Sequence, residues 1–434
     1  MYNNDALSTN LQSQFERWLK ARKPQEQRFL DFYQDVMRIS RDDDTKDIGT
    51  PKAQKSKVFI GSTRGKVRSA KAKIKDALFA ASKYPFDTSP TNEQLKDYSD
   101  AMESILKVQL DEMDFRGVLG MGVDSICQDG TGFIFGPFVE TKEHASVESG
   151  LTGLKETKHE YKAPRYEHAR TIDVYPDPDA ETEQDGMGIY WSARKQQHEI
   201  RALKGGGYND EAIDYALTQA TISVMEGSDL AENLRANHYR YEEDGRIWFQ
   251  RYFGLVKKSE LKAWSSGSEV ATDDDEELVE AVITMAGGVV IKADETPYDE
   301  RPAYRCVYEE VAHEFYGVGI PENNEPHQRV TNAAFRLYME GKAFALLKTC
   351  SIDRSKYLAT EDFKLFPGKK YEMRPGLTVD ERKTAMIWHD VEDVTQGWES
   401  VIMLSEKFSD DDTGITKYTQ GNDATHLNKT ATGI

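Results

Sequence analysis

Cysteine is scarce in this 434-residue sequence, which has three, at positions 127, 306 and 350. None belongs to a CxxC pair, so the sequence excludes a disulfide-rich framework and favours free thiols in a reducing compartment. No apolar run approaches the ~20 residues that cross a bilayer. The N-terminus also lacks the basic-then-apolar layout of a signal peptide. We therefore expect a protein made in the cytoplasm, or in a particle assembled there, without membrane contact.

Basic residues are outnumbered, with 56 Lys and Arg against 75 Asp and Glu, for a formal net charge of −19. A protein that grips DNA over its whole surface is normally basic, because its affinity comes from neutralising phosphates. The acidity therefore argues against a simple DNA-binding module. It remains compatible with a wall along which DNA slides, since tight phosphate contacts would arrest movement.

Catalytic motifs are missing as well. The segment Gly61–Lys66 is one residue short of a P-loop, and Val67 replaces the Ser or Thr that binds magnesium. His313-Glu314 lacks the second histidine of a zinc protease helix, and the nine histidines show no ligand spacing. No GxSxG motif or glycine-rich dinucleotide fingerprint occurs. We predict no catalytic residue, no metal site and no cofactor.

The chain does contain ample core material, since aromatic residues make up 10% of it. Its length predicts two to four structural units. Apolar residues between positions 11 and 19 recur at helical spacing, Pro24 interrupts the pattern, and it resumes from 29 to 37. A long helix is predicted from Thr91 to about Ile126, with Thr91 and Gln94 as a capping box. Residues from about 160 to 310 have the β character of strands, with turn residues between the segments.

Two charged segments carry open alternatives. The basic segment Lys52–Lys75 is the best local candidate for contact with nucleic acid. It also fits an exposed arm, or a helix that pairs with the acidic remainder of a neighbouring subunit. The acidic runs Asp273–Glu277 and Asp410–Asp412 are predicted to be solvated loops, because contiguous carboxylates diverge and cannot easily converge on one ion.

Two late helices are predicted, at about 325–349 and 394–408. The first has one polar stripe on an otherwise apolar surface, which indicates burial on several sides. The second has an apolar stripe, and its acidic residues lie on another face. Both patterns fit an ordinary two-helix core, or a helix pair packed into a ring with a polar stripe facing a lumen. The polar stripe of the first helix comprises Arg329, Asn332, Arg336 and Glu340; the apolar stripe of the second comprises Val394, Trp398, Val401 and Phe408.

Several short motifs resemble the portal proteins of short-tailed bacteriophages. FYGVGIPE at 315–322 and HQRVTN at 327–332 are similar to the segment before the first stem helix. LFPG at 365–368 with MRPG at 373–376 resembles the clip. TGIT at 413–416 and LNKTATG at 427–433 resemble the end of the second stem helix and the channel loop after it. Upstream, residues 67–79, 127–132 and 174–180 resemble the wing.

The resemblance implies an α+β portal fold without a crown or barrel. The family's sequence continues beyond the last motif, so we expect the native gene product to be longer than this chain. The implied divisions are a wing at 1–324 (helical to about 130, β-rich from about 131 to 310), a first stem helix at 325–349, a small α/β clip at 350–393, a second stem helix at 394–409 and a channel loop at 410–434.

The resemblance also implies a function. The chain would form a dodecameric ring at one capsid vertex of the virion, and double-stranded DNA would pass through its channel during packaging and ejection. Implied partners are the large terminase subunit, tail adaptor or head-completion proteins, and the major capsid and scaffolding proteins. Another capsid-associated or scaffolding protein, or a terminase-like ATPase, is the alternative.

Candidate site residues follow from these divisions. The docking candidates in the clip are Pro367, Gly368, Lys369, Lys370 and Arg374. The DNA-channel candidates are Arg329, Arg336, Glu340, Glu399, Glu406, Asp410, Lys417 and Lys429.

Overall fold

The computed structural model describes residues 6–37, 58–79, 84, 88–92, 96–150, 153–219, 246–266, 277–346, 349–360, 362–364, 369–389 and 397–416. The chain divides into two compact units. Unit 1 comprises Met1–Met37, Ser62–Asn324 and Ile415–Ile434, and unit 2 comprises Arg38–Gly61 and Glu325–Gly414.

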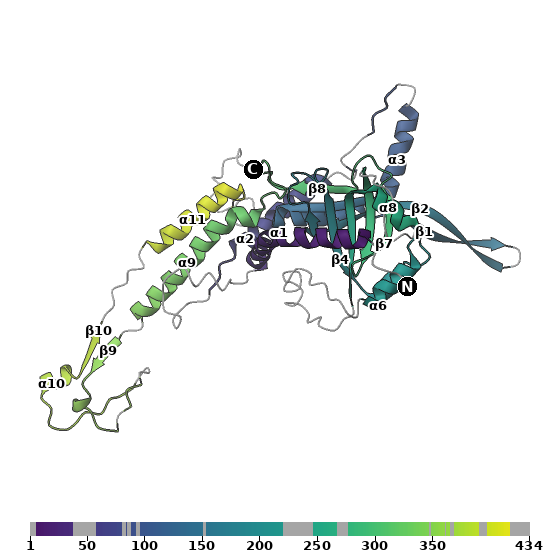
Figure 1. Ribbon diagram of the computed structural model, residues 1–434. Helices are drawn as coiled ribbons and strands as arrows, with labels where there is room; N and C mark the ends of the chain where they lie inside the picture. Colours follow the sequence, from purple (N-terminus) through teal and green to yellow (C-terminus); the bar gives the residue numbers. More distant parts are fainter. Residues whose placement is uncertain are drawn as a thin grey trace, which may run out of the picture. The chain divides into compact units, whose positions relative to one another are not determined.

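Most helices and strands belong to unit 1 (Figure 1). Its helices are α1 (Ala6–Met37), α2 (Ser62–Phe79), α3 (Lys96–Glu112), α4 (Phe115–Asp129), α5 (Gln197–Arg201), α6 (Asp210–Gln219) and α8 (Lys258–Ser266). Its strands are β1 (Thr131–Gly150), β2 (Gly153–Ala169), β3 (Val174–Pro176), β4 (Gly188–Lys195), β5 (Ile247–Lys257), β6 (Leu278–Ala286), β7 (Val289–Glu295) and β8 (Ala303–Val307).

A five-stranded antiparallel sheet, in the order β3-β4-β5-β6-β7, forms the core of unit 1. Successive side chains alternate between its faces, so Tyr190 and Tyr252 point to one face while Ile189 and Phe253 point to the other. Helix α1 covers the tyrosine face, where Tyr190 donates a hydrogen bond to the Leu11 carbonyl (3.1 Å). The opposite face packs against α6 and against a second sheet, β2-β1-β8.

The long hairpin β1–β2 was not foreseen. Its register runs from Phe133 opposite Ala169 to Gly150 opposite Gly153. The register shifts beyond Phe135, next to the cis bond between Gly136 and Pro137. The sequence of its outer part is polar on both strands, so it lacks the alternation of apolar residues that predicts a strand.

Two helix predictions were wrong in unit 1. Pro24 does not interrupt the first helix: α1 runs through it. The lost backbone hydrogen bond costs about 3 kcal/mol, and burial of Phe29 and Phe32 on the far side offsets it by roughly 1.5–3 kcal/mol each. The helix predicted over 91–126 is two helices, broken at Asp114, whose backbone is left-handed (φ 52°) and whose carboxylate caps α4 by accepting from Gly117.

A small apolar cluster joins α2 and α4 to two distant segments. Val67 of α2 and Cys127 of α4 pack with Ile320, at the start of α9, and with Ile415, just after α11. The buried ammonium of Lys66 donates to the Ile415 carbonyl (3.1 Å). The first turn of α9 and the segment after α11 are thus held by the same part of unit 1.

The late helices differ from their predicted bounds. Helix α9 spans Ile320–Leu346 and begins five residues before the predicted start, with Pro326 inside it. Helix α11 spans Trp398–Thr413, so the acidic run 410–412 is helical and not a loop. Gly397, with a left-handed backbone, precedes it. Between them lie β9 (Thr349–Ile352), α10 (Val379–Lys383) and β10 (Met386–His389), and β9 pairs with β10 in an antiparallel sheet.

Candidate functional site

The polar face of α9 holds an extended segment that precedes α2. Asn332 accepts a hydrogen bond from the Ile60 amide (2.8 Å), and Gln328 donates to the Ile60 carbonyl. One turn further on, Arg336 donates to the Val58 carbonyl (3.0 Å). These three side chains are spaced by four residues and so lie on one face of the helix. They satisfy backbone groups of a segment that has no sheet partner among the described residues.

Within this chain, two residues of the polar stripe of α9 are covered. Asn332 and Arg336 are only 3% and 5% exposed, because the segment before α2 covers them. Glu340 is partly buried. Arg329 differs, since its side chain is 56% exposed and pairs with Glu325 at 2.9 Å. Of the two channel arginines predicted on this helix, Arg329 is the one that lies at the surface of the chain.

Helix α11 contacts α9 through small polar side chains. The Ser405 hydroxyl lies 3.1 Å from the Thr331 hydroxyl and donates to the His327 carbonyl. Nε2 of His327 lies 2.5 Å from a carboxylate oxygen of Asp412. Ser409 is buried on the same face of α11 as Ser405. The contact among these side chains is polar.

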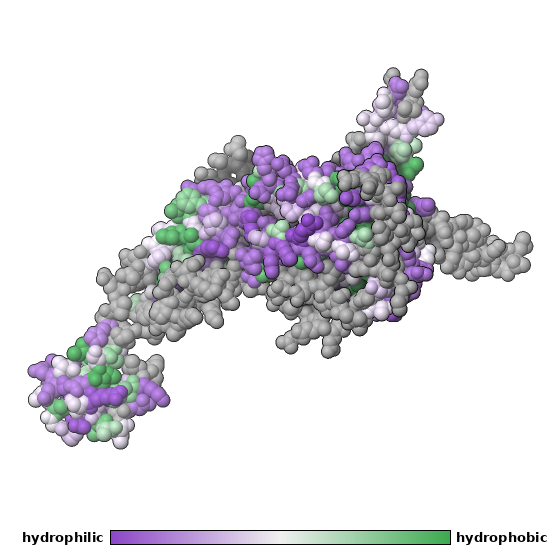
Figure 2. Space-filling model, in the orientation of Figure 1, coloured by the Kyte–Doolittle hydropathy of each residue, from purple (hydrophilic) through white to green (hydrophobic). Residues whose placement is uncertain are grey.

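Four apolar residues of α11 lie at the surface of the chain, where Figure 2 shows hydrophobic side chains over this helix. Its acidic residues Glu399, Glu406 and Asp410 are spaced by seven and four residues and share a third face. Helix α11 thus presents an acidic stripe beside an apolar surface. The exposed apolar residues are Val401, Met403, Leu404 and Phe408.

The region around β9 and β10 is the basic part of unit 2. It has eight basic and six acidic side chains between Thr349 and His389, in a chain of net charge −19. The Lys369 ammonium lies 5.0 Å from the centre of the Tyr371 ring, and Arg374 donates to the Tyr357 carbonyl (3.2 Å). Lys370 is exposed. The other predicted residues Pro367, Gly368, Lys417 and Lys429 lie outside the described residues.

The start of α9 is fixed by a close backbone contact. Gly130 has a left-handed backbone (φ 79°), and a Cβ there would lie 2.1 Å from the Gly317 carbonyl oxygen. Its own carbonyl accepts from the Tyr308 amide (2.9 Å). Burial raises the pKa of the neighbouring Asp129, at the end of α4, to about 6, against the smaller opposing effect of a hydrogen bond from Thr171. Sequence reasoning did not identify this contact, because its two sides are far apart in the chain.

Among the described residues, no three or more His, Cys, Asp or Glu side chains group as metal ligands. No helix in the described ranges is long and apolar enough to cross a membrane.

A family model described as "Phage SU10 portal protein" matches residues 139–434, which include most of the β-rich part of unit 1 and both α9 and α11. The chain belongs to this portal family. No curated protein matches it significantly. The match confirms the resemblance to phage portal proteins and their α+β fold. Portal proteins are structural proteins.

Proposed function

We propose that this chain is the subunit of a ring at one capsid vertex of a phage virion, which forms the channel for double-stranded DNA during packaging and ejection. The observation that carries the proposal is the portal-family match across the segment with the helix pair α9 and α11. The exposed apolar residues of α11 support it, because a surface of that kind is normally covered by another protein surface. We expect twelve copies in the ring, as in related portals.

The acidic stripe of α11 supplies a physical mechanism for sliding. Carboxylates of Glu399, Glu406 and Asp410 in a channel wall would repel phosphates and prevent DNA from sticking. Arg329 is already paired with Glu325, which weakens its attraction for phosphate. Glu340 and the two lysines Lys417 and Lys429 remain candidates on the family resemblance alone.

The basic region at 349–389 is the proposed docking surface for the large terminase subunit, and afterwards for tail adaptor proteins. Lys369, Lys370 and Arg374 supply positive charge in this region, which also has the exposed apolar residues Ile387 and Trp388. Aromatic and basic residues together are typical of binding hot spots. Capsid and scaffolding proteins would contact the subunit elsewhere.

Electron microscopy of the purified chain in negative stain tests the ring. We expect particles with a central opening and twelvefold symmetry. Shells without openings would favour a capsid protein, and monomers at micromolar concentration would refute the ring. ATP hydrolysis measured on the same sample separates a portal from a terminase-like ATPase.

Charge reversal on α11 tests the channel wall. The double variant Glu399→Lys/Glu406→Lys should lower the amount of DNase-protected DNA per particle when it replaces the wild-type subunit. Asp411→Lys is the matched control, because Asp411 is exposed on the same helix but on another face. Equal loss of protected DNA in both variants, with rings intact, would contradict the assignment of the acidic stripe to the channel.

A further inference from the structure

Helix α3 lacks the packing that normally stabilises a helix. None of its 17 residues is buried. Tyr98, Met102 and Ile105 form a stripe at helical spacing, and Tyr98 is 73% exposed. An isolated helix of this length is marginal in water, so most of its stability must come from burial of that stripe. Another surface is therefore expected to cover α3.

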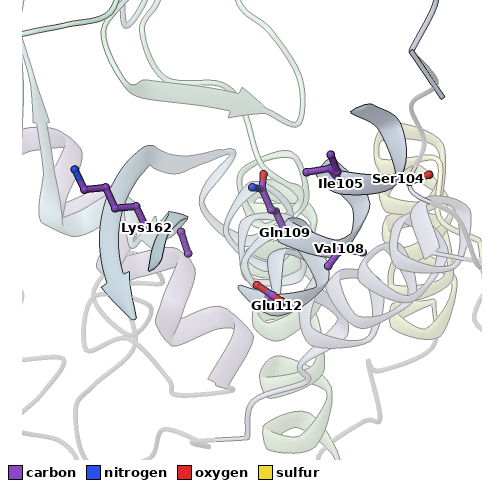
Figure 3. A pocket seen from close by; sticks show the side chains of 7 residues that line it. Ser104, Ile105, Val108, Gln109, Glu112 and Lys162 are labelled. Carbon is purple, nitrogen blue, oxygen red and sulfur yellow. The ribbon is translucent and has the colours of Figure 1, made fainter. Parts of the chain in front are cut away.

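A groove beside α3 could receive an apolar side chain. It has a volume of about 380 Å³ and lies between α3 and β2. Figure 3 shows Ile105, Val108 and Glu112 on the helix side and Lys162 on the strand side. Ala163 contributes to the lining. The exposed surface of α3 thus continues into a concave, largely apolar site.

The charge of α3 is opposite to that of α2. Helix α3 has five acidic and two basic side chains, whereas α2 has six basic and one acidic. Asp97 and Asp100 are exposed and form no ion pair among the described residues. Arg64 and Arg68 of α2 are likewise exposed and without an acidic partner in the described part of the chain. Helix α2 is thus strongly basic in a chain of net charge −19.

The two charged surfaces lie at opposite ends of α4 and do not pair within one chain. Helix α3 ends at Glu112, just before the start of α4. Arg64 follows Thr63, whose hydroxyl accepts from Asn324 (2.6 Å) beside the end of α4. Helix α4 has 15 residues, about 22 Å at 1.5 Å per residue. Two different, complementary patches at the two ends of α4 suit a head-to-tail contact, which closes into a ring.

We propose that α3 of one subunit docks on α2 of the next copy of this chain, with Asp97 and Asp100 against Arg64 and Arg68. The apolar stripe of α3 and its groove then cover the exposed Met121 of the neighbouring α4. Met121 follows Gly120, where a Cβ would lie 3.8 Å from the side chain of Lys75 on α2. Opposite charges steer the encounter and fix the register, and the apolar groove supplies buried area. This inference rests on the proposed ring and names one of its contacts.

A charge-swap experiment on the full chain tests the contact. The variants Arg64→Glu/Arg68→Glu and Asp97→Lys/Asp100→Lys should each raise the concentration at half assembly by about tenfold, through lost attraction and new repulsion. Combining the four changes should restore assembly. Mass photometry over a range of protein and salt concentrations gives the measurement. Restored assembly also shows that the variant helices remain folded.

Lys20→Glu/Lys23→Glu is the matched control, because it makes the same charge change on exposed positions of α1. It should leave assembly unchanged. If the wild type forms rings and the α2 and α3 variants do so equally well, or if the combined variant is not restored, the α2–α3 contact is refuted while the ring stands. If the wild type forms no rings, the proposed function itself fails.

Discussion

Two arginines on α9, seven residues apart, are expected to respond very differently to replacement by methionine. Methionine keeps the length of the side chain and the helix propensity while removing the charge. Arg336 is buried and donates to the Val58 carbonyl, and hydrogen bonds that involve a charged group contribute about 1.5–3 kcal/mol. Arg329 is exposed and pairs with Glu325 one turn away, which is worth about 0.2–0.5 kcal/mol. Arg336→Met should therefore lower the free energy of unfolding several times more than Arg329→Met.

Two measurements on the full chain check this difference. Urea unfolding at one fixed protein concentration compares the free energies of unfolding. Hydrogen exchange of the Ile60 amide, which donates to Asn332, reports on the segment itself. A local loss of 2 kcal/mol speeds exchange about 30-fold. We expect this acceleration in Arg336→Met and none in Arg329→Met.

The outcome also separates the two roles considered for Arg336. If exchange at Ile60 is the same in both variants while DNA retention falls only in Arg336→Met, the guanidinium acts on DNA and the structural role is refuted.

Three other changes test the packing. Gly130→Ala should lower the free energy of unfolding in urea more than Gly205→Ala does. Both glycines have a left-handed backbone (φ 79° and 75°), so both variants share its cost of about 1–2 kcal/mol. Only at Gly130 would the added Cβ clash, with the Gly317 carbonyl oxygen, so equal losses would contradict the close contact. The pKa of Asp129 is about 6 in the folded protein, above its ordinary 3.8, so the protonated carboxyl stabilises the fold at low pH, and this stability is lost as pH rises from about 4 to 6. Asp129→Asn should therefore have a free energy of unfolding roughly 1–3 kcal/mol above that of the wild type at pH 7, and an equal one at pH 3. A difference that stays constant from pH 3 to 7 would count against this role of Asp129. Ser405→Leu should lower the melting temperature by overpacking the contact between α9 and α11, at about 1–3 kcal/mol, whereas an unchanged melting temperature would mean that this contact is loose.

Local patterns sufficed for much of the fold. The pattern of apolar residues predicted a strand-rich stretch from about 160 to 310, and β4 to β7 lie within it. Helical spacing likewise predicted α9 and α11, although their ends shifted by several residues. Helix ends depend on residues such as Gly397, which precedes α11, and α9 accommodates Pro326 in its second turn.

The sequence by itself determined the composition, the family resemblance and which side chains share a face of each helix. Only the tertiary structure decided what covers those faces. Arg336 and Val58 are 278 positions apart in the chain, so no local periodicity connects them, and the polar stripe of α9 proved to hold a backbone segment. The periodicity of α11 likewise does not show that its buried residues are Ser405 and Ser409, because that depends on what packs against the helix. The periodicity of a helix shows which residues share one of its faces, whereas their burial depends on the other segment that packs against that face.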